Sequence, residues 1–225
     1  MSSLLPALVG AVIGDLVSAT GAVIGGLAGA SGSEMLQRLM AKRLQAAREI
    51  FLDEMKRGGN RLEPEPDEVL AVVYRYMRAA QEGTARLNLR LMAKVVQGLA
   101  HTGSLVADKF LCHAERVASL RREEIVLLAT IHRHQKQLVK SDASRDDIYP
   151  YVQMREAVER DLIPRVFPDE KTLRAVAAAT IRTGYIHDEL MTLDSVGIFM
   201  TTPLLDELIA LAPFEAALDE EGKAG

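Results

Sequence analysis

Apolar residues recur at helical spacing over most of this chain of 225 residues, and no other feature constrains the fold as strongly. Spacings of three and four residues place side chains on one face of an α-helix, so such a stripe predicts an amphipathic helix. The first stripe predicts a helix from Glu34 to Lys56, which Gly58 and Gly59 end. Its inward positions are expected to be Leu36, Leu39, Met40, Ala47, Ile50 and Phe51.

Two further stripes extend this pattern. The second, from Leu70 to Leu99, predicts one long helix that Gly83 and Gly98 weaken without breaking. The third predicts a helix with Leu105, Phe110, Leu111, Ala114 and Val117 inward. Residues 34–118 are therefore expected to form a helical bundle or hairpin.

The pattern changes after Leu120. Helices are expected at 121–137, 151–163 and 169–184, followed by short β-prone pieces at 185–186 and 196–200 and a final helix at 202–211. Asp169 has the position of an N-cap residue, and Gly184 that of a left-handed residue at a helix end. Pro203 has the position of a first helical residue.

This order resembles a winged-helix unit over residues 119–212. In that fold the third helix ends in a glycine and an apolar pair, here Gly184 and Tyr185-Ile186. A threonine, here Thr202, then follows the hairpin and caps the last helix. The expected fold class is all-α, mainly helical: a bundle or hairpin with a small winged-helix-like unit that contains a short β-hairpin.

Four segments follow from these patterns. They are an apolar segment (1–33), a helical bundle region (34–118), a winged-helix-like region (119–212) and an acidic tail (213–225). The tail holds Asp219, Glu220 and Glu221, and we expect it to fray.

The apolar segment has small residues spaced four apart, and Asp15 is its only charged side chain. Small residues at this spacing let two helix backbones approach closely. The positions expected to make oligomer or membrane contacts are Gly10, Gly14, Gly21, Gly25 and Gly29. Residues 4–30 are long enough to cross a bilayer, which takes about 20 apolar residues. A central Asp costs about 3 kcal/mol in a membrane, which favours the alternative, a buried or oligomeric glycine-rich helix.

Composition excludes several classes of protein. The net charge is −4, so no chain-wide positive field attracts nucleic acid. One cysteine allows no internal disulfide and suits a reducing compartment. There is no tryptophan and few other aromatic residues, which argues against a stacking surface for bases or sugars.

No arrangement of residues indicates catalysis, a cofactor or a metal. His132 and His134 are two residues apart and diverge on a helix, as do the neighbours Cys112 and His113. No Gly-x-Ser-x-Gly elbow and no phosphate-binding loop is present. We therefore expect a protein that is not an enzyme.

A winged-helix-like unit raises the alternative of DNA binding. On its third helix the residues that can reach phosphates are Lys171, Arg174 and Arg182. The wing would carry Asp188, Glu189 and Asp194, which repel phosphates. Packing or protein contact is therefore favoured over DNA.

An apolar N-terminus, a helical hairpin and a winged-helix-like end together resemble bacterial proteins of the abortive-infection alpha group. The resemblance implies a role in defence or stress. We expect a non-enzymatic bacterial interaction protein of the cytoplasm that forms oligomers, binds a protein partner or contacts the membrane through its N-terminus. The alternatives are a winged-helix DNA-binding regulator and a membrane-active effector.

Overall fold

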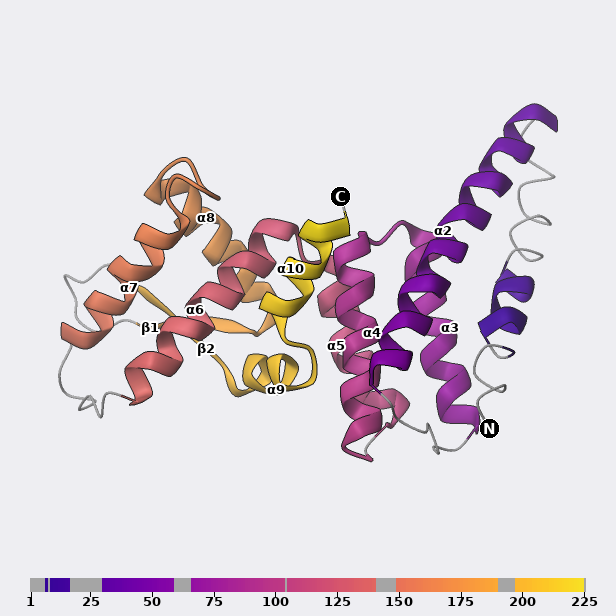
Figure 1. The fold of residues 1–225 in the computed structure, drawn as a ribbon. Helices are drawn as coiled ribbons and strands as arrows, with labels where there is room; N and C mark the ends of the chain where they lie inside the picture. Colours follow the sequence, from indigo (N-terminus) through magenta and orange to yellow (C-terminus); the bar gives the residue numbers. More distant parts are fainter. Residues whose placement is uncertain are drawn as a thin grey trace. The chain divides into compact units, whose positions relative to one another are not determined.

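The computed structural model describes residues 7, 9–16, 30–58, 66–103, 105–140, 149–189 and 197–224. Helices dominate these residues, and the described strands form one small antiparallel sheet (Figure 1). This confirms the expected mainly helical fold with a short β-hairpin. The chain divides into two compact units, Met1–Ser119 and Leu120–Gly225.

The helices of the first unit pack around one buried central helix. Its elements include α2 (Ala30–Arg57), α3 (Pro66–Glu82), α4 (Arg86–His101) and α5 (Ala107–Ser119). α4 packs against α2, α3 and α5, and all of its side chains from Leu87 to Val96 are buried. A helix covered on several sides carries apolar residues around most of its circumference, as α4 does.

The expected long helix over Leu70–Leu99 is wrong, because it is broken at Gly83 into α3 and α4. Gly83 has φ +95°, a left-handed conformation that an L side chain rarely adopts. The amide of Gly83 donates to the Ala80 carbonyl at 3.1 Å, and that of Thr84 donates to Ala79 at 3.0 Å. These two bonds form a Schellman motif, which ends α3.

A buried carboxylate joins α2 to α4. Glu54 of α2 is fully buried and accepts hydrogen bonds from Arg90 and Lys94 of α4, each at 3.0 Å. Arg57, one turn along α2, also donates to Glu54, at 3.2 Å. Removing one partner of a buried ion pair leaves an uncompensated charge, so this cluster fixes the register of α2 on α4.

The second unit consists of helices and a two-stranded sheet. Its elements are α6 (Arg122–Lys140), α7 (Tyr149–Leu162), α8 (Glu170–Thr180), the 3₁₀ turn η1 (Ile181–Thr183), β1 (Ile186–Glu189), β2 (Ile198–Thr201), α9 (Pro203–Leu211) and α10 (Phe214–Ala224). β1 and β2 pair antiparallel, with Ile186 opposite Thr201 and Glu189 opposite Ile198. β2 lies against α6 and α7, so the apolar side chain of Ile198 is buried.

The local signals at Asp169 and Gly184 are confirmed, whereas the expected capping bond of Thr202 is wrong. The Asp169 side chain accepts a hydrogen bond from the Thr172 amide at 2.8 Å, as an N-cap residue does. Gly184 has φ +71° and follows η1. The Thr202 side chain makes no capping bond and instead donates to the Gly184 carbonyl at 2.7 Å, which ties the start of α9 to the turn before β1.

The expectation of a frayed acidic tail at 213–225 is wrong. Residues Phe214–Ala224 form α10, which packs on α6. Phe214 and Ala217, three residues apart, are buried on one face, while the acidic residues lie at partly or fully exposed positions. Burial of the apolar face stabilises this helix more than the clustered acidic charges destabilise it, so the tail is part of the folded unit.

Candidate functional site

The two glycines of the described N-terminal helix, Gly10 and Gly14, have no side chain of the described residues packed against them. Within residues 9–16, Gly10 and Gly14 lie on the exposed side of the helix. A Cβ atom added at either glycine would meet no atom within 4 Å. The buried side chains of the same helix are Val9, Val12 and Leu16. The other glycines singled out by the sequence lie outside the described residues: Gly21, Gly25 and Gly29.

Among the described residues, no element covers the start of α2. No side chain is buried from residue 34 to residue 43, a segment that we call the α2 arm, and Leu44 is the first buried residue. Figure 1 shows the beginning of α2 extending past the ends of α3 and α4. Met35 is 77% exposed, Leu36 36% and Leu39 45%, so the prediction that the two leucines lie in the core is wrong. Among the helices of the described residues, none is long and apolar enough to cross a membrane.

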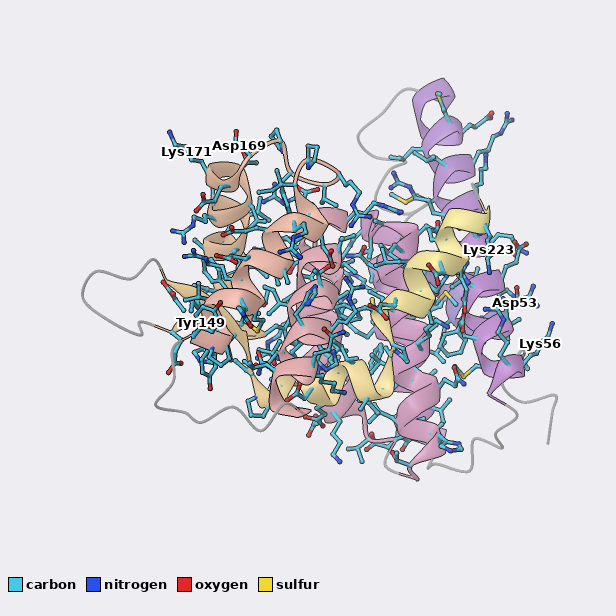
Figure 2. The ribbon with its side chains drawn as sticks, turned by 60° about the vertical axis from the view of Figure 1, so that its left-hand side comes forward. Asp53, Lys56, Tyr149, Asp169, Lys171 and Lys223 are labelled. Carbon is cyan, nitrogen blue, oxygen red and sulfur yellow. The ribbon has the colours of Figure 1, made fainter. Side chains whose placement is uncertain are left out.

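The three cations predicted to reach DNA have different environments. Lys171 lies in the first turn of α8 and points away from the unit, beside Asp169 (Figure 2). Arg174 forms an ion pair with Glu170, one turn earlier on α8, at 3.0 Å. Arg182 forms an ion pair with Glu124 of α6. Only Lys171 is thus presented as an isolated charge, because two of the three cations pair with carboxylates of the same unit.

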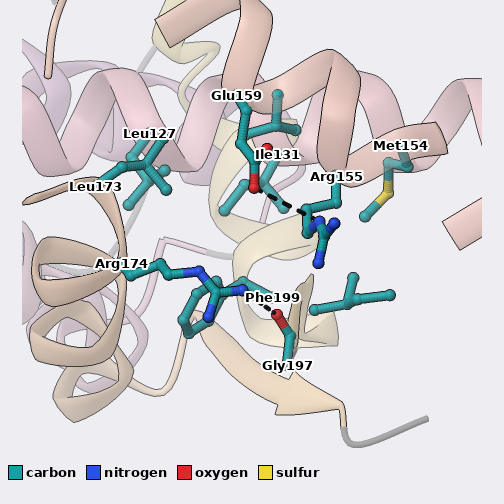
Figure 3. A pocket seen from close by; sticks show the side chains of 11 residues that line it. Leu127, Ile131, Met154, Arg155, Glu159, Leu173, Arg174, Gly197 and Phe199 are labelled. Atoms are coloured by element: carbon teal, nitrogen blue, oxygen red, sulfur yellow. Dashed lines mark hydrogen bonds and ion pairs between the residues drawn. The ribbon is translucent and has the colours of Figure 1, made fainter. Parts of the chain in front are cut away.

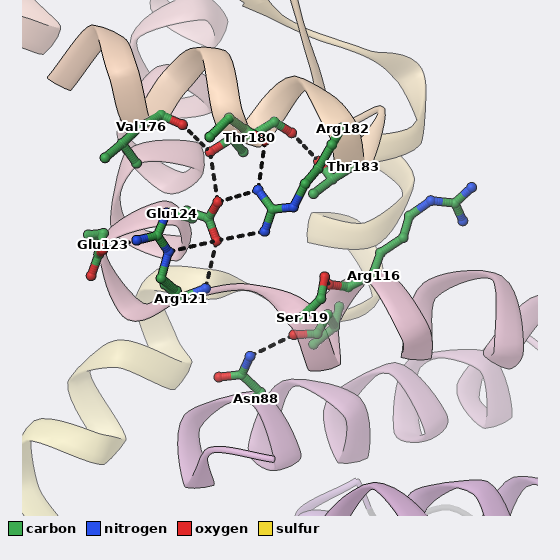
Figure 4. Close-up of polar contacts among 12 residues, drawn as sticks. Asn88, Arg116, Ser119, Arg121, Glu123, Glu124, Val176, Thr180, Arg182 and Thr183 are labelled. Atoms are coloured by element: carbon green, nitrogen blue, oxygen red, sulfur yellow. Dashed lines mark hydrogen bonds and ion pairs between the residues drawn. The ribbon is translucent and has the colours of Figure 1, made fainter. Parts of the chain in front are cut away.

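The Arg182–Glu124 pair is part of a hydrogen-bond network that joins α6 to η1 (Figure 4). Arg182 donates to the two Glu124 oxygens at 2.5 and 3.1 Å. Glu124 also accepts a bond from the Arg121 amide at 2.7 Å, and its side chain is fully buried. Burial opposes ionisation of Glu124, but the bonds from Arg182 and Arg121 outweigh it and hold the pKa of this carboxyl below its ordinary value. The network therefore stabilises the fold at neutral pH.

The strand next to these cations is acidic. Asp188 and Glu189 are exposed on β1, and Glu189 contacts His187 at 2.9 Å. Asp194 lies outside the described residues. The observed carboxylates would repel a phosphate backbone that approached β1.

A small cavity lies between α6, α7, α8 and β2 (Figure 3). Its volume is about 20 Å³, room for about one water molecule. Arg155 forms an ion pair with Glu159 at 3.5 Å, and Arg174 donates to the Gly197 carbonyl at 3.5 Å. Burial raises the pKa of Glu159 above its ordinary value. The remaining lining is mostly apolar, so this cavity is a packing gap.

A larger hollow, of about 310 Å³, opens between α6, α9 and α10. His132 and Lys136 line it from one face of α6, and Phe214 lines it from α10. Sequence reasoning missed this hollow. The one signal for it was the spacing of four between His132 and Lys136, which places them on one helix face.

The histidines diverge as the sequence predicts. His132 faces Asp206 at 3.4 Å, whereas His134 contacts Asp161 at 2.9 Å. Cys112 is exposed and its neighbour His113 is buried. No group of three or more potential metal ligands comes together among the residues that the structure describes.

Comparison of the chain with protein-family models, curated proteins and solved structures found no match.

Proposed function

We propose that this chain is a non-enzymatic interaction protein that self-associates through its N-terminal region. The observation that carries the proposal is the uncovered α2 arm, together with the open face of Gly10 and Gly14. Adjacent exposed apolar side chains on a monomer mark interaction surfaces, because they lose contact with water when a partner covers them. An amphipathic helix without a covering element is one of the common forms of such a surface.

Charge favours a second copy of the chain as the occupant. Glu34 lies at the start of the α2 arm, with its carboxylate 3.5 Å from the Arg38 guanidinium of the same helix. Lys42 and Arg43 lie at the end of the arm. If two arms pack antiparallel about a two-fold axis, Glu34 of each copy lies beside the basic end of the other. Apolar contacts between Met35, Leu36 and Leu39 would then lie between these charge pairs. The glycines at positions 10 and 14 would allow a second close backbone contact.

The test is multi-angle light scattering on the full chain and on the double variant Leu36→Glu, Leu39→Glu. We expect the wild type to be an oligomer and the double variant to be a monomer, because charge on the arm opposes burial. Leu70→Glu is the matched control, since Leu70 is a 44% exposed leucine on α3 of the same unit. Equal masses for the wild type and the double variant would exclude self-association through the arm.

The same proteins are then mixed with vesicles of phosphatidylcholine and phosphatidylglycerol and centrifuged. We expect the protein to stay in the supernatant. If the wild type is a monomer and sediments with vesicles, and the double variant does not, the alternative of a membrane-active effector replaces self-association.

We further propose that the second unit contacts protein rather than DNA. Its helix–helix–helix–hairpin order resembles a winged helix, but Arg174 and Arg182 pair with carboxylates of the same unit. Protein interfaces tolerate mixed charges at their rim, whereas phosphate binding needs a net positive surface. The alternative, a winged-helix DNA-binding regulator, would depend mainly on Lys171.

Only the resemblance to the abortive-infection alpha group bears on the biological role. It favours a bacterial protein of the cytoplasm that acts in defence or stress, and self-association would then be the step that changes during the response.

A further inference from the structure

The hollow between α6, α9 and α10 has the size and lining of a small-molecule site. Its volume of about 310 Å³ falls at the lower end of the range for ligand pockets, roughly 300–1,000 Å³. Its apolar lining comes from Ala129, Ile209, Pro213 and Phe214. Polar groups line the rest of the hollow: His132, Arg133, Lys136, Gln137 and Glu215. A hollow that combines apolar side chains with converging polar groups can hold a small amphipathic molecule.

Two of the lining charges balance each other. Arg133 forms ion pairs with Glu215 at 2.9 Å and with Asp161 at 2.8 Å. Lys136, in contrast, has no hydrogen-bond or ion-pair partner among the described residues, and it is exposed to solvent. The hollow therefore presents one unpaired cation from the described part of the chain.

His132 provides a second polar group. The residue is 8% exposed, and its Nε2 atom is buried without a hydrogen bond among the described residues. Burial and the neighbouring Lys136 charge lower the pKa of His132, so its ring is neutral near pH 7 and can donate one hydrogen bond from Nε2. The nearest carboxylate is that of Asp206, 3.4 Å away. The Asp206 side chain is 54% exposed, so its repulsion of an anion acts through water and is weak.

We propose that this hollow binds a small carboxylate with an apolar body, such as a medium-chain fatty acid. The carboxylate pairs with Lys136 and accepts a hydrogen bond from His132 Nε2. The apolar body lies against Ile209 and Phe214. Binding then satisfies the buried imidazole nitrogen, pairs the free lysine and removes apolar surface from water.

The test is isothermal titration calorimetry of the full chain at pH 7 with octanoate below its micelle concentration. Octylamine and 1-octanol have the same apolar chain with a positive charge or none, and serve as matched ligands. We expect saturable 1:1 binding of octanoate and at least tenfold weaker binding of the other two. Absence of octanoate binding, or equal binding of all three, would overturn the proposal.

Lys136→Gln tests the polar contact without disturbing the core, because Lys136 is exposed. We expect about tenfold weaker octanoate binding, the factor that corresponds to about 1.4 kcal/mol. Lys171→Gln, on α8 of the same unit, is the matched control and should bind octanoate like the wild type. Unchanged binding by Lys136→Gln, or equal losses in both variants, would contradict the proposed site.

Side-chain NMR of the histidines gives a readout that does not depend on a variant. The chain has five histidines, so their ring signals can be separated. We expect octanoate to shift the His132 signals saturably and leave those of His134, which contacts Asp161, unchanged. Octanoate binding that leaves the His132 signals in place would show that the ligand lies elsewhere.

Discussion

At the scale of single residues, Arg182 shows how a cation on a candidate DNA-binding helix serves the fold instead. Its guanidinium meets the fully buried Glu124 carboxylate, which lies 58 positions earlier in the chain. Removing Arg182 leaves that carboxylate buried with fewer hydrogen bonds.

We expect Arg182→Ala to lower the free energy of unfolding by about 2 kcal/mol at pH 7. The folded pKa of Glu124 lies below its ordinary value of 4.5, so the pair stabilises the fold at neutral pH. This stabilisation is lost as the pH falls through the folded pKa, and the difference between wild type and variant should shrink in acid. Urea denaturation across a pH series measures the difference in unfolding free energy between wild type and Arg182→Ala, with Lys171→Ala as the control. A difference that grows below about pH 4 would contradict the role given to this pair.

Two glycines give opposite expectations for the same substitution. Gly83→Ala forces an L side chain into φ +95° and should cost about 1 kcal/mol of unfolding free energy. Gly222→Ala lies in α10 with nothing within 4 Å of the added Cβ, and should stabilise by about 0.5 kcal/mol because alanine favours helix. Urea denaturation followed by circular dichroism compares them. Equal effects of the two changes would exclude a special backbone role for Gly83.

The sequence predicted those residue roles that depend on close neighbours. Asp169 as an N-cap and Gly184 as a left-handed residue need only a few flanking positions. The contacts of Glu54 with Arg90 and of Glu124 with Arg182 depend on helices meeting in space, and nothing in the local sequence indicates them.

At the scale of elements, helix existence was easier to predict than helix ends and helix faces. The stripe from Leu70 to Leu99 continues through Gly83 because α3 and α4 both contribute to one core. The same periodicity placed Leu36 and Leu39 in the core, but a stripe gives the apolar face without showing whether a neighbour covers it. For this reason the α2 arm, which carries the proposed function, was missed.

α10 illustrates a competition between charge and apolar burial. Phe214→Ala should lower the unfolding free energy by about 3 kcal/mol, because it removes a buried aromatic ring and leaves a cavity. The control is Asp219→Ala, which removes an exposed acidic side chain of the same helix and should change the stability little. Thermal unfolding followed by circular dichroism measures both variants. A loss below about 0.5 kcal/mol for Phe214→Ala would support the frayed tail that the composition suggested.

At the scale of the whole molecule, we expect the chain to bind duplex DNA only weakly near physiological salt. The net charge is −4, and at 0.15 M salt the screening length is about 8 Å, so distant cations add little. An anisotropy titration of the full chain with mixed-sequence duplex over a salt series tests this. Sub-micromolar affinity with a steep salt dependence, reduced by Lys171→Ala, would establish the DNA-binding regulator instead.

The central proposal concerns the open N-terminal region, and one substitution tests it without disturbing the folded chain. Gly10 lies on an exposed helix face, and a Cβ atom added there would meet no atom within 4 Å. The folded monomer should therefore tolerate Gly10→Leu. A partner helix packed against that face should not tolerate Gly10→Leu, because the leucine side chain would hold the two helix backbones apart. Gly222→Leu, at an equally open glycine of α10, is the matched control.

The measurement is the molar mass of the full chain by light scattering over a concentration series. The chain mass is 24.6 kDa. We predict a mass of at least twice that value for the wild type and for Gly222→Leu, and a shift toward the single-chain mass for Gly10→Leu. A wild type that stays at 24.6 kDa at every concentration would contradict self-association, and a Gly10→Leu protein that associates like the wild type would contradict the contact proposed at the glycine face.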